Sequence, residues 1–397
     1  MKDCSALAGR PRFDIADIVR DHRAQLEATV PLCMAQRRVL SAIELCRTAA
    51  LGGHMDRCRS CGHETQAYNS CRNRHCPKCQ SLAAEKWIGS RTAKLLPTRH
   101  FHVVVTMPAE LRPLTRAFPR LLYDALFACT SETLLELGQS RLDATLGITM
   151  VLHTWTREMK FHPHVHAIVT AGGLACDGAT WNHSNKQYLF PVEVIGELVR
   201  GKMLDWLKRS HRRGVFDTFD EFFDPEAFDR LISRLWSHDW VVYAKKPFRD
   251  STHVMKYLGR YTHRVAIANS RIVDVTDTSV AFRTKAGKVI TVSPVEFLRR
   301  FCLHVLPAGF NKIRHYGLYS SAALNTTHVI AKAMLTSSVP NNATLPVTAA
   351  PITLTWQQHL RLLTARDVNA CPVCGAPVDH LPVARILSRP SPQASSP

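Results

Sequence analysis

Paired cysteines between residues 58 and 79 constrain the fold of this chain more than any other feature. The pattern is Cys58-x2-Cys61, then fourteen residues, then Cys76-x2-Cys79. Two such pairs supply four thiolates, which is a complete tetrahedral ligand set for a structural zinc ion. We therefore predict one structural zinc ion, held by Cys58, Cys61, Cys76 and Cys79 in a small zinc-binding module.

Other donors leave this ligand assignment open, because another set or a second ion is compatible with the spacing. The surplus donors are Cys71, His54, His63 and His75. Near the C-terminus, Cys371-x2-Cys374 is a further pair that cannot fill a zinc coordination sphere alone. A metal there would need His380 or another segment of the chain, and we do not expect one. The N-terminus lacks the apolar core of a secretory signal. Clustered cysteines in such a chain indicate metal ligation in a reducing compartment, so we expect a cytoplasmic protein.

Charge and motif content predict the partners of the chain. Lys and Arg number 51 against 32 Asp and Glu, a net charge of +19, which favours nucleic acid. An anionic membrane is the competing partner, but we find no apolar run of spanning length and no convincing basic amphipathic stretch. The segment Gly196-x4-Gly201-Lys202 resembles a phosphate-binding loop, yet Met203 stands where Ser or Thr would hold magnesium. We therefore expect DNA as a partner, no membrane and no nucleotide cofactor.

Apolar periodicity predicts an α+β fold in three consecutive parts. Residues 1–96 form a helical, cysteine-rich zinc module, with two helices over 14–50, Asp14 as the first N-cap, and a third helix through 82–95. Residues 97–320 form a sheet domain with a helix over 119–137 and a helix over 294–306 capped by Ser293. Its strands are expected at 100–107, 148–155, 161–169, 241–246, 271–276, 279–284 and 288–293. Residues 321–397 are expected to be a loosely packed extension with a partly disordered tail.

The strand FHPHVHAIV, residues 161–169, carries the most informative histidine pattern. His164 and His166 alternate along it and so share one face, about 7 Å apart, which is twice the rise per residue. A lone histidine in a strand is usually structural. A His-hydrophobic-His pair followed by an apolar run is rarer and favours joint binding of one divalent ion.

A third ligand follows if strands 148–155 and 161–169 form a hairpin. A turn centred between Glu158 and Met159 places His153 opposite His164, and directly opposed residues approach to about 5 Å. We therefore predict His153 as the third ligand. The alternatives are His102 and His162.

The segment THVMKYLGRYTHR, residues 252–264, predicts a helix with two tyrosines on one face. Tyr257 and Tyr261 are four residues apart and so lie one turn apart. Two buried core aromatics are the default explanation, but basic residues surround this pair downstream of the candidate metal site. A tyrosine of pKa near 10 becomes a nucleophile where positive charge favours phenolate. The candidate DNA-binding residues are Lys256, Arg260, Arg264, Lys245 and Lys246.

Together the segments LHTW, FHPHVHAIV, YLGRYTHRVAI and EFLRRFCLHVLPAGFNKIRHYG resemble the rolling-circle transposases of the insertion-sequence-ninety-one family, which are two-tyrosine HUH (His-hydrophobic-His) endonucleases. The resemblance covers roughly residues 15–320 and includes the cysteine segment RNRHCPKCQ. It implies an antiparallel, RRM-like sheet with flanking helices and with the histidines on a central strand. It also implies a catalytic Mg²⁺ or Mn²⁺ held by His164 and His166.

The same resemblance implies that Tyr257 and Tyr261 form 5′-phosphotyrosine links while single DNA strands are nicked and rejoined to mobilise an insertion sequence. Such a bacterial protein would associate with the nucleoid when bound to DNA. Two other classes remain. One is a non-catalytic zinc-dependent DNA-binding protein derived from such an element. The other is a histidine-based metallohydrolase of small molecules, which would not need the two tyrosines.

Overall fold

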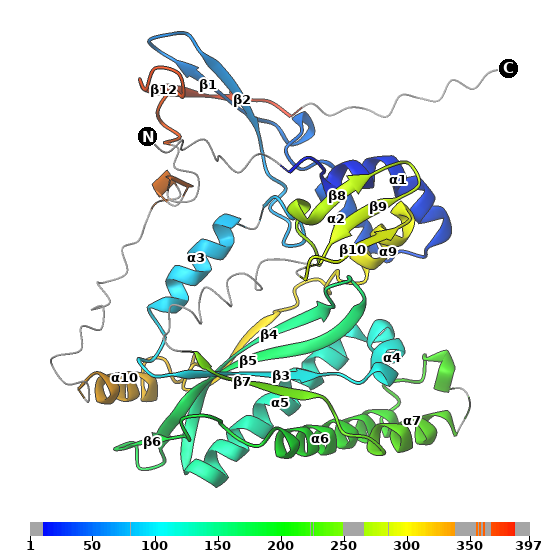
Figure 1. Cartoon of the computed structure of the whole chain (residues 1–397), viewed down its shortest axis with the longest axis vertical. Helices are drawn as coiled ribbons and strands as arrows, with labels where there is room; N and C mark the ends of the chain where they lie inside the picture. The colour runs from blue at the N-terminus through cyan, green and yellow to red at the C-terminus, as the bar shows by residue number, and fades with distance from the viewer. Residues whose placement is uncertain are drawn as a thin grey trace. The chain divides into compact units, whose positions relative to one another are not determined.

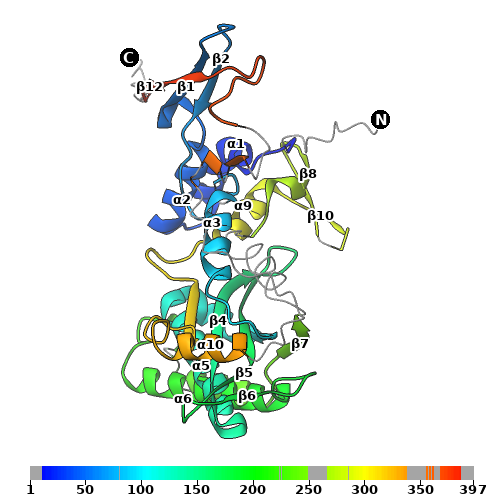
Figure 2. The ribbon, with the colours of Figure 1, turned by 90° about the vertical axis from the view of Figure 1, so that its left-hand side faces the viewer.

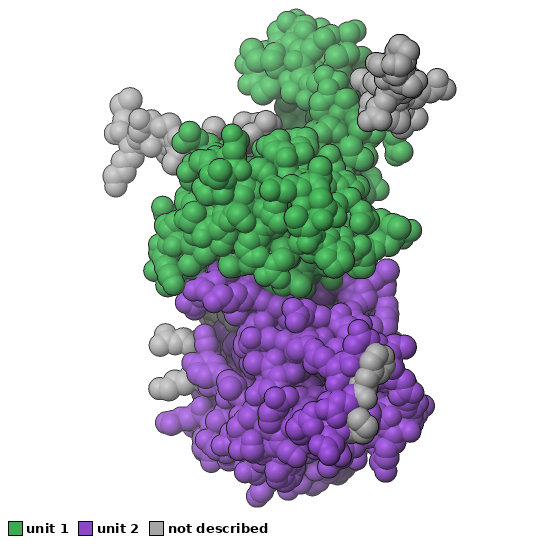
Figure 3. All heavy atoms as spheres, turned by 90° about the vertical axis from the view of Figure 1, so that its right-hand side faces the viewer, with its two compact units in different colours: residues 1–86, 263–305, 352–397 green, residues 87–262, 306–351 purple. Residues whose placement is uncertain are grey.

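The structure, a computed structural model, describes residues 11–79, 81–222, 224, 226–248, 266–284, 286–337, 355, 357–358, 360–361 and 367–385. The chain divides into two compact units, each assembled from separate stretches of sequence (Figure 3). Unit 1 comprises residues 1–86, 263–305 and 352–397, and unit 2 comprises residues 87–262 and 306–351. This division differs from the three consecutive parts expected, because residues 263–305 pack with the N-terminal helices.

The helical part of unit 1 contains α1 (Ile15–Thr29), α2 (Met34–Glu44) and α9 (Pro294–Cys302). Both predicted caps are confirmed, since Asp14 accepts from the Ala16 amide and Ser293 accepts from the Glu296 amide. A stripe of buried residues on α1, Ile15, Ile18, Val19 and Leu26, follows helical spacing. Strands β8 (Ile272–Val275), β9 (Val280–Arg283) and β10 (Val289–Val292) form an antiparallel sheet in the order β10-β9-β8.

A second three-stranded sheet in unit 1 joins the two ends of the sequence. Strands β1 (Gly53–Cys58) and β2 (Glu64–Tyr68) form a hairpin, and β12 (Val378–Val383) pairs with the open edge of β1. The resulting order is β12-β1-β2. The sequence did not predict β12, which lies in the expected extension.

Unit 2 is built on an antiparallel sheet, as predicted (Figure 1). Its main path runs β11 (Ile313–Gly317), β4 (Ala144–Trp155), β5 (Phe161–Ala175), β3 (His100–Thr106) and β7 (Val242–Phe248), and β6 (Trp181–His183) pairs with β5. Helix α5 (Pro119–Leu142) packs against β4 and β5, α6 (Val192–Arg212) packs against α5, and α7 (Ala227–Trp236) packs against α6. The histidine strand β5 therefore lies at the centre of the sheet.

The helix α10 (Thr327–Ser337) corrects the expectation that residues beyond 320 are loosely packed. It lies beside β5 and β6 (Figure 2) and buries Ala331 and Leu335 in a cluster with Leu174 and Tyr319. The remaining helices among the described residues are α3 (Ser81–Thr92), α4 (Arg112–Ala117) and 3-10 turns at Ala49–Leu51, Ala109–Leu111, Asp220–Phe222 and Asn269–Arg271. Among the described residues, no helix combines the length and the apolar character needed to cross a bilayer.

Candidate functional site

Three histidines converge on one face of the central strands of unit 2. The β4–β5 register pairs His153 with His164, which confirms the predicted hairpin. One ring nitrogen from each of His153, His164 and His166 lies within 4.8 Å of the others. The ring centroids of His153 and His166 are 4.2 Å apart, and those of His164 and His166 are 4.9 Å apart. The sequence thus predicted which three imidazoles meet, and we call them the histidine triad.

The two alternative ligands, His102 and His162, lie around the triad and hold it. His164 Nδ1 donates to the carbonyl oxygen of His162 at 2.7 Å, which leaves Nε2 as the ligand atom of His164. His102 Nε2 is 2.8 Å from His166 Nδ1, with the two rings stacked at 5.0 Å. Both residues therefore occupy the outer positions that orient ligating imidazoles.

Burial favours the neutral form of two imidazoles at this site, His164 and His102. Desolvation lowers the pKa of His164 to about 4. Desolvation, and next the positive charge of Lys245, lower the pKa of His102 to about 4. A neutral imidazole is the form that binds a metal ion, so both pKa shifts suit a metal site at neutral pH.

The face of the sheet that carries the triad is opposite the face that packs on α5. Met150 and Arg314 are register partners, and the guanidinium of Arg314 lies over the α5 residue Phe127. Residues next to each other in a strand alternate between faces, so Val151 lies on the face opposite Met150. Val151 is the register partner of His166, so this opposite face carries the triad. Part of that face is covered by apolar residues that pack on Val151 and Ile168, namely Trp87, Ile88, Leu95, Phe248 and Ile313.

Strand β7 contributes a cation to the face that carries the histidines. Lys245 is the register partner of His102, and Tyr243 is the partner of Val104. Val104 is in turn paired with His166, so Tyr243 and Lys245 lie on the same face as the triad. The predicted DNA-binding residue Lys245 is thus next to the histidines, whereas the side chain of Lys246 lies outside the described residues.

The predicted nucleophiles Tyr257 and Tyr261 lie outside the described residues. So do the predicted DNA-binding residues Lys256, Arg260 and Arg264. Strand β7 ends at Phe248, whose ring centroid is 6.2 Å from that of His102. Strand β7 therefore ends beside a histidine that contacts the triad.

The cysteines form two clusters in unit 1, and the predicted single set of Cys58, Cys61, Cys76 and Cys79 is wrong. The two Cys-x2-Cys pairs do not combine with each other. The first cluster contains Cys46, Cys71, Cys76 and Cys79, and the second contains Cys58, Cys61, Cys371 and Cys374. Within each cluster the candidate ligand atoms lie within 4.8 Å of one another. Each Cys-x2-Cys pair instead combines with cysteines from elsewhere in the chain.

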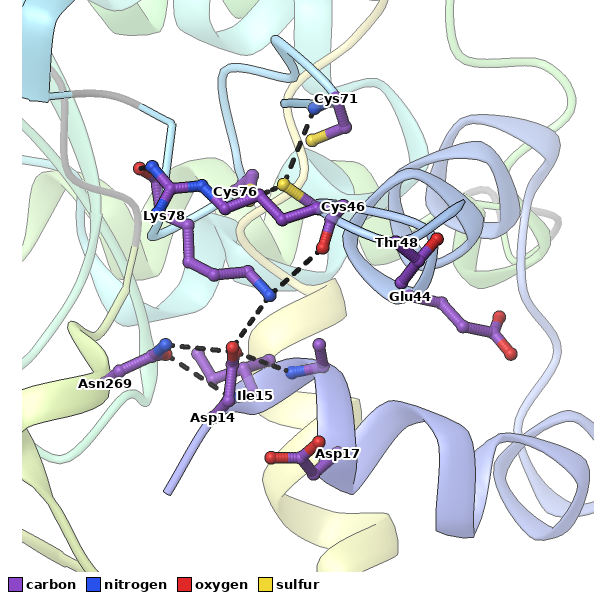
Figure 4. A network of polar contacts seen from close by, with 12 residues as sticks. Asp14, Ile15, Asp17, Glu44, Cys46, Thr48, Cys71, Cys76, Lys78 and Asn269 are labelled. Carbon is purple, nitrogen blue, oxygen red and sulfur yellow. Dashed lines mark hydrogen bonds and ion pairs between the residues drawn. The ribbon is translucent and has the colours of Figure 1, made fainter. Parts of the chain in front are cut away.

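In the first cluster, Cys46 lies two residues beyond the end of α2 and completes the set. Its sulfur is 3.3 Å from that of Cys79 and 3.6 Å from that of Cys76. Hydrogen bonds from the thiols of Cys71 and Cys76 lower the pKa of Cys46 to about 7. Lys78 lies between Cys76 and Cys79 in the sequence. It contacts Asp14 at 2.7 Å and donates to the Cys46 carbonyl at 3.3 Å (Figure 4). Lys78 therefore anchors this loop to the cap of α1.

In the second cluster, two short loops from opposite ends of the sequence face each other. Cys58 Sγ is 3.4 Å from Cys374 Sγ, and Cys61 Sγ is 3.7 Å from Cys371 Sγ. The backbone amide of Cys61, as the largest effect, lowers the pKa of Cys58 to about 6. Both pairs are followed by glycine, Gly62 and Gly375, whereas Gln80 follows Cys79. This shared Cys-x2-Cys-Gly signature is the signal that could have paired the two segments from sequence.

Much of the positive charge around the second cluster is neutralised. Arg57 pairs with Glu64 at 2.6 Å, and Arg59 pairs with Asp379 at 2.5 Å. Both guanidinium groups are therefore engaged in local ion pairs at the protein surface.

A positively charged groove of about 560 Å³ lies in unit 2 beside the edge strand β11. Its lining includes Arg91, Arg120, Arg314, Asp124 and His315. Asp124 pairs with Arg314 and offsets one of the three arginines. Burial, followed by the charges of Arg91 and Lys94, lowers the pKa of His315 to about 4, so this histidine is neutral at physiological pH. The groove therefore carries excess positive charge suited to an anionic ligand.

The phosphate-loop resemblance at Gly196–Lys202 has a structural explanation. Gly196, Gly201 and Lys202 all lie within α6, and Lys202 pairs with Glu136 of α5 at 2.8 Å. A continuous helix does not present the row of backbone amides that a phosphate-binding loop requires. The segment is a packing helix.

Comparisons with known proteins identify the class of this protein as a transposase, a DNA-cleaving and strand-transferring enzyme. The family described as "Putative transposase" matches residues 147–326, which include the histidine triad. The family described as "Transposase zinc-binding domain", of the IS91 type, matches residues 18–107. The chain belongs to the insertion-sequence-ninety-one (IS91) family of transposases, and it carries that family's structural zinc-binding domain.

Two relatives extend the match over most of the chain. "Putative transposase y4qJ" of Sinorhizobium fredii (strain NBRC 101917 / NGR234) is 41% identical over 373 residues, covering 91% of this chain and 92% of the relative. "Transposase for insertion sequence element IS801" of Pseudomonas savastanoi pv. phaseolicola is 30% identical over 291 residues, covering 70% and 68%. No solved structure matches the chain.

Proposed function

We propose that this transposase nicks and rejoins single DNA strands through covalent 5′-phosphotyrosine intermediates, and thereby mobilises an insertion sequence. The observation that carries the proposal is the histidine triad, three imidazoles converging on one face of the central sheet. Strand β7, which precedes the tyrosine-bearing segment in the sequence, ends at Phe248, beside His102. A candidate metal site next to the strand that precedes two candidate nucleophiles supports phosphodiester chemistry.

The donor set of the triad fits a divalent transition metal. Three imidazoles suit manganese better than magnesium, which prefers oxygen ligands. The outer contacts from His102 and the His162 carbonyl are those expected around ligating histidines. A divalent ion held there would neutralise the charge of the scissile phosphate and orient its oxygens. We therefore propose Mn²⁺, with Mg²⁺ as the weaker alternative.

The covalent step in this proposal is carried by Tyr257 and Tyr261. The phenolic oxygen of one tyrosine loses its proton and bonds to the phosphorus, the bond to the 3′ oxygen breaks, and that oxygen leaves as a 3′ hydroxyl. Tyr257 follows Phe248 by nine residues in the sequence, in the segment 252–264 that is predicted to be a helix. Tyr261 follows one turn later, so two successive strand transfers at one site are feasible.

Positive charge would hold the DNA strand at the site. Lys245 lies on the same sheet face as the triad, and Lys256, Arg260 and Arg264 alternate with the tyrosines in the sequence. The groove with Arg91, Arg120 and Arg314 provides a further surface for a phosphodiester backbone. We propose single-stranded element ends and target as the DNA partner, with no nucleotide cofactor because the phosphotyrosine link conserves the bond energy.

The zinc ion of the family domain is assigned, in this proposal, to Cys46, Cys71, Cys76 and Cys79. Four thiolates leave no open coordination position, so the ion would have a structural role only. The Lys78–Asp14 contact connects this cluster to the start of α1. Loss of the ion should therefore destabilise unit 1 without changing the chemistry of the triad directly.

The test is a nicking assay with labelled single-stranded oligonucleotides, purified full-length protein and added Mn²⁺. We expect cleaved strands and a covalent protein–DNA species that resists denaturation. Tyr188→Phe serves as a matched control, because Tyr188 is 54% exposed and remote from β7 in the sequence. Binding without any nicking or adduct would support the alternative, a non-catalytic zinc-dependent DNA-binding protein.

A further inference from the structure

We propose that Cys58, Cys61, Cys371 and Cys374 bind a second structural zinc ion, which joins the C-terminal segment to the β1–β2 hairpin. All four sulfurs lie within 4.8 Å of one another. The two closest cross-pairs are Cys58–Cys374 at 3.4 Å and Cys61–Cys371 at 3.7 Å. Four thiolates at these separations form the closed tetrahedral set typical of a structural zinc site.

The two loops that supply these cysteines have the same backbone arrangement. Gly62 has φ of +71° and donates to the Cys58 carbonyl at 3.2 Å. Gly375 has φ of +75° and donates to the Cys371 carbonyl at 2.9 Å. A Cβ atom added to either glycine would meet nothing within 4 Å, so glycine is needed for its left-handed backbone and not for space.

This arrangement directs backbone amides at sulfur atoms. The amide of Ser60 lies 3.4 Å from Cys58 Sγ, and the amide of Val373, at the equivalent position, lies 3.4 Å from Cys371 Sγ. An amide that donates to sulfur stabilises a thiolate more than a neutral thiol. Two independent segments therefore present the same thiolate-stabilising loop toward one point.

The β12-β1-β2 sheet, which this site would stabilise, has few buried side chains of its own. Of the 17 residues in its three short strands, Cys58 alone is buried, and the others are exposed or half-buried. Small units without an apolar core depend on a metal or another cross-link. The exposed ion pair of Arg59 with Asp379 cannot replace such a core.

The site would lie partly beyond the matched zinc-binding family domain. That domain covers residues 18–107, whereas Cys371 and Cys374 come from the other end of the chain. The first cluster contains four different cysteines and so does not compete for the same thiols. Each chain would then hold two structural zinc ions, one within the N-terminal region and one that needs both ends of the sequence.

The test combines zinc counting with residue-resolved alkylation on the full-length protein. The background is His164→Ala/His166→Ala, which removes the histidine triad as a source of bound metal. We expect native mass spectrometry to give two zinc ions per chain and one after Cys371→Ser/Cys374→Ser. The matched control Cys33→Ser/Cys176→Ser alters two exposed cysteines outside both clusters and should retain two.

Alkylation tests the same site without altering its cysteines. In the zinc-loaded protein, Cys371 and Cys374 should react with iodoacetamide far more slowly than Cys33 and Cys176, and a chelator should abolish the difference. Two zinc ions retained after Cys371→Ser/Cys374→Ser would overturn the proposal. So would alkylation of Cys371 and Cys374 at the rate of the control cysteines, or a disulfide between the two loops in the zinc-loaded protein.

Discussion

His102 Nε2 lies 2.8 Å from His166 Nδ1, with the two imidazole rings stacked nearly parallel. His102 comes from β3 and His166 from the neighbouring strand β5. The contact engages one nitrogen of His166 and so determines which nitrogen is directed at the rest of the triad. His102 is therefore a positioning residue for the proposed metal site and not a fourth ligand.

Replacing His102 should weaken the binding of the catalytic metal ion without abolishing it. We expect His102→Ala to raise the Mn²⁺ concentration needed for half-maximal nicking by about 10–100-fold, because outer partners of ligating histidines have effects of this size. Saturating Mn²⁺ should restore most of the activity, and His102→Gln, which retains a polar group, should show a smaller shift. A low rate that Mn²⁺ cannot restore would instead indicate a purely structural role.

Replacing a histidine of the triad should abolish DNA nicking and leave DNA binding largely intact. We expect His164→Ala and His166→Ala each to abolish nicking, because the two remaining imidazoles would hold an ion poorly. The affinity for oligonucleotides should stay within about threefold of wild type, because most of the binding is electrostatic. His183→Ala, an exposed histidine on β6, is the control. Normal nicking and normal Mn²⁺ dependence in His153→Ala would refute its assignment as the third ligand.

Replacing the tyrosines should separate the two strand transfers. Each Tyr→Phe change removes one oxygen and little packing, so folding should survive. We expect Tyr257→Phe or Tyr261→Phe to nick poorly or to stall after one transfer, and the double variant to form no covalent adduct detectable by mass spectrometry. An adduct in the double variant would mean that another residue attacks, and Tyr243, 55% exposed on the face of the triad, would be examined next.

Acid should destabilise unit 2 through His100. Desolvation lowers the pKa of this fully buried histidine to about 4, and its Nε2 is 2.7 Å from the Tyr319 hydroxyl, which accepts from the Leu96 amide. The unfolded chain takes up a proton near the ordinary pKa of about 6.5, while the folded chain resists until about 4. The free energy of unfolding should therefore be highest above pH 6.5 and fall as the pH decreases toward 4.

The measurement is thermal or denaturant unfolding at several pH values. His100→Gln cannot titrate, so its free energy of unfolding should change less across this window than that of wild type, by an amount on the order of 3 kcal/mol at most. Identical pH dependence in the two proteins would show that His100 does not contribute. Lower stability of the variant at pH 7 alone would not bear on the prediction, because the comparison is of slopes.

The groove beside β11 should contribute to the salt dependence of DNA binding. We expect Arg91→Ala and Arg120→Ala each to weaken binding to all oligonucleotides similarly and to reduce the slope of log affinity against log salt by about one. Arg209→Ala, on the exposed side of α6 and paired with Asp205, is the matched control. Unchanged slopes in both groove variants would exclude this surface from the DNA path.

Features set by local spacing were predictable from the sequence alone. Alternation along one strand placed His164 and His166 on one face, and the length of one hairpin placed His153 opposite His164. Asp14 and Ser293 were identified as helix caps because a cap acts within three residues of its own position. In each case the interacting groups are close in sequence, so the backbone geometry of one helix or one hairpin is sufficient.

Only the tertiary structure decided which cysteines share a cluster and what supports the triad. Cys76 and Cys79 join Cys46, while Cys58 and Cys61 join a pair more than 300 residues away. His102 contacts His166 because β3 lies beside β5 in the sheet. A Cys-x2-Cys pair or an isolated histidine has the same local geometry whichever partner it meets. Its partner is set by which strands pair and which helices pack, and that depends on the burial of apolar surface over the whole unit.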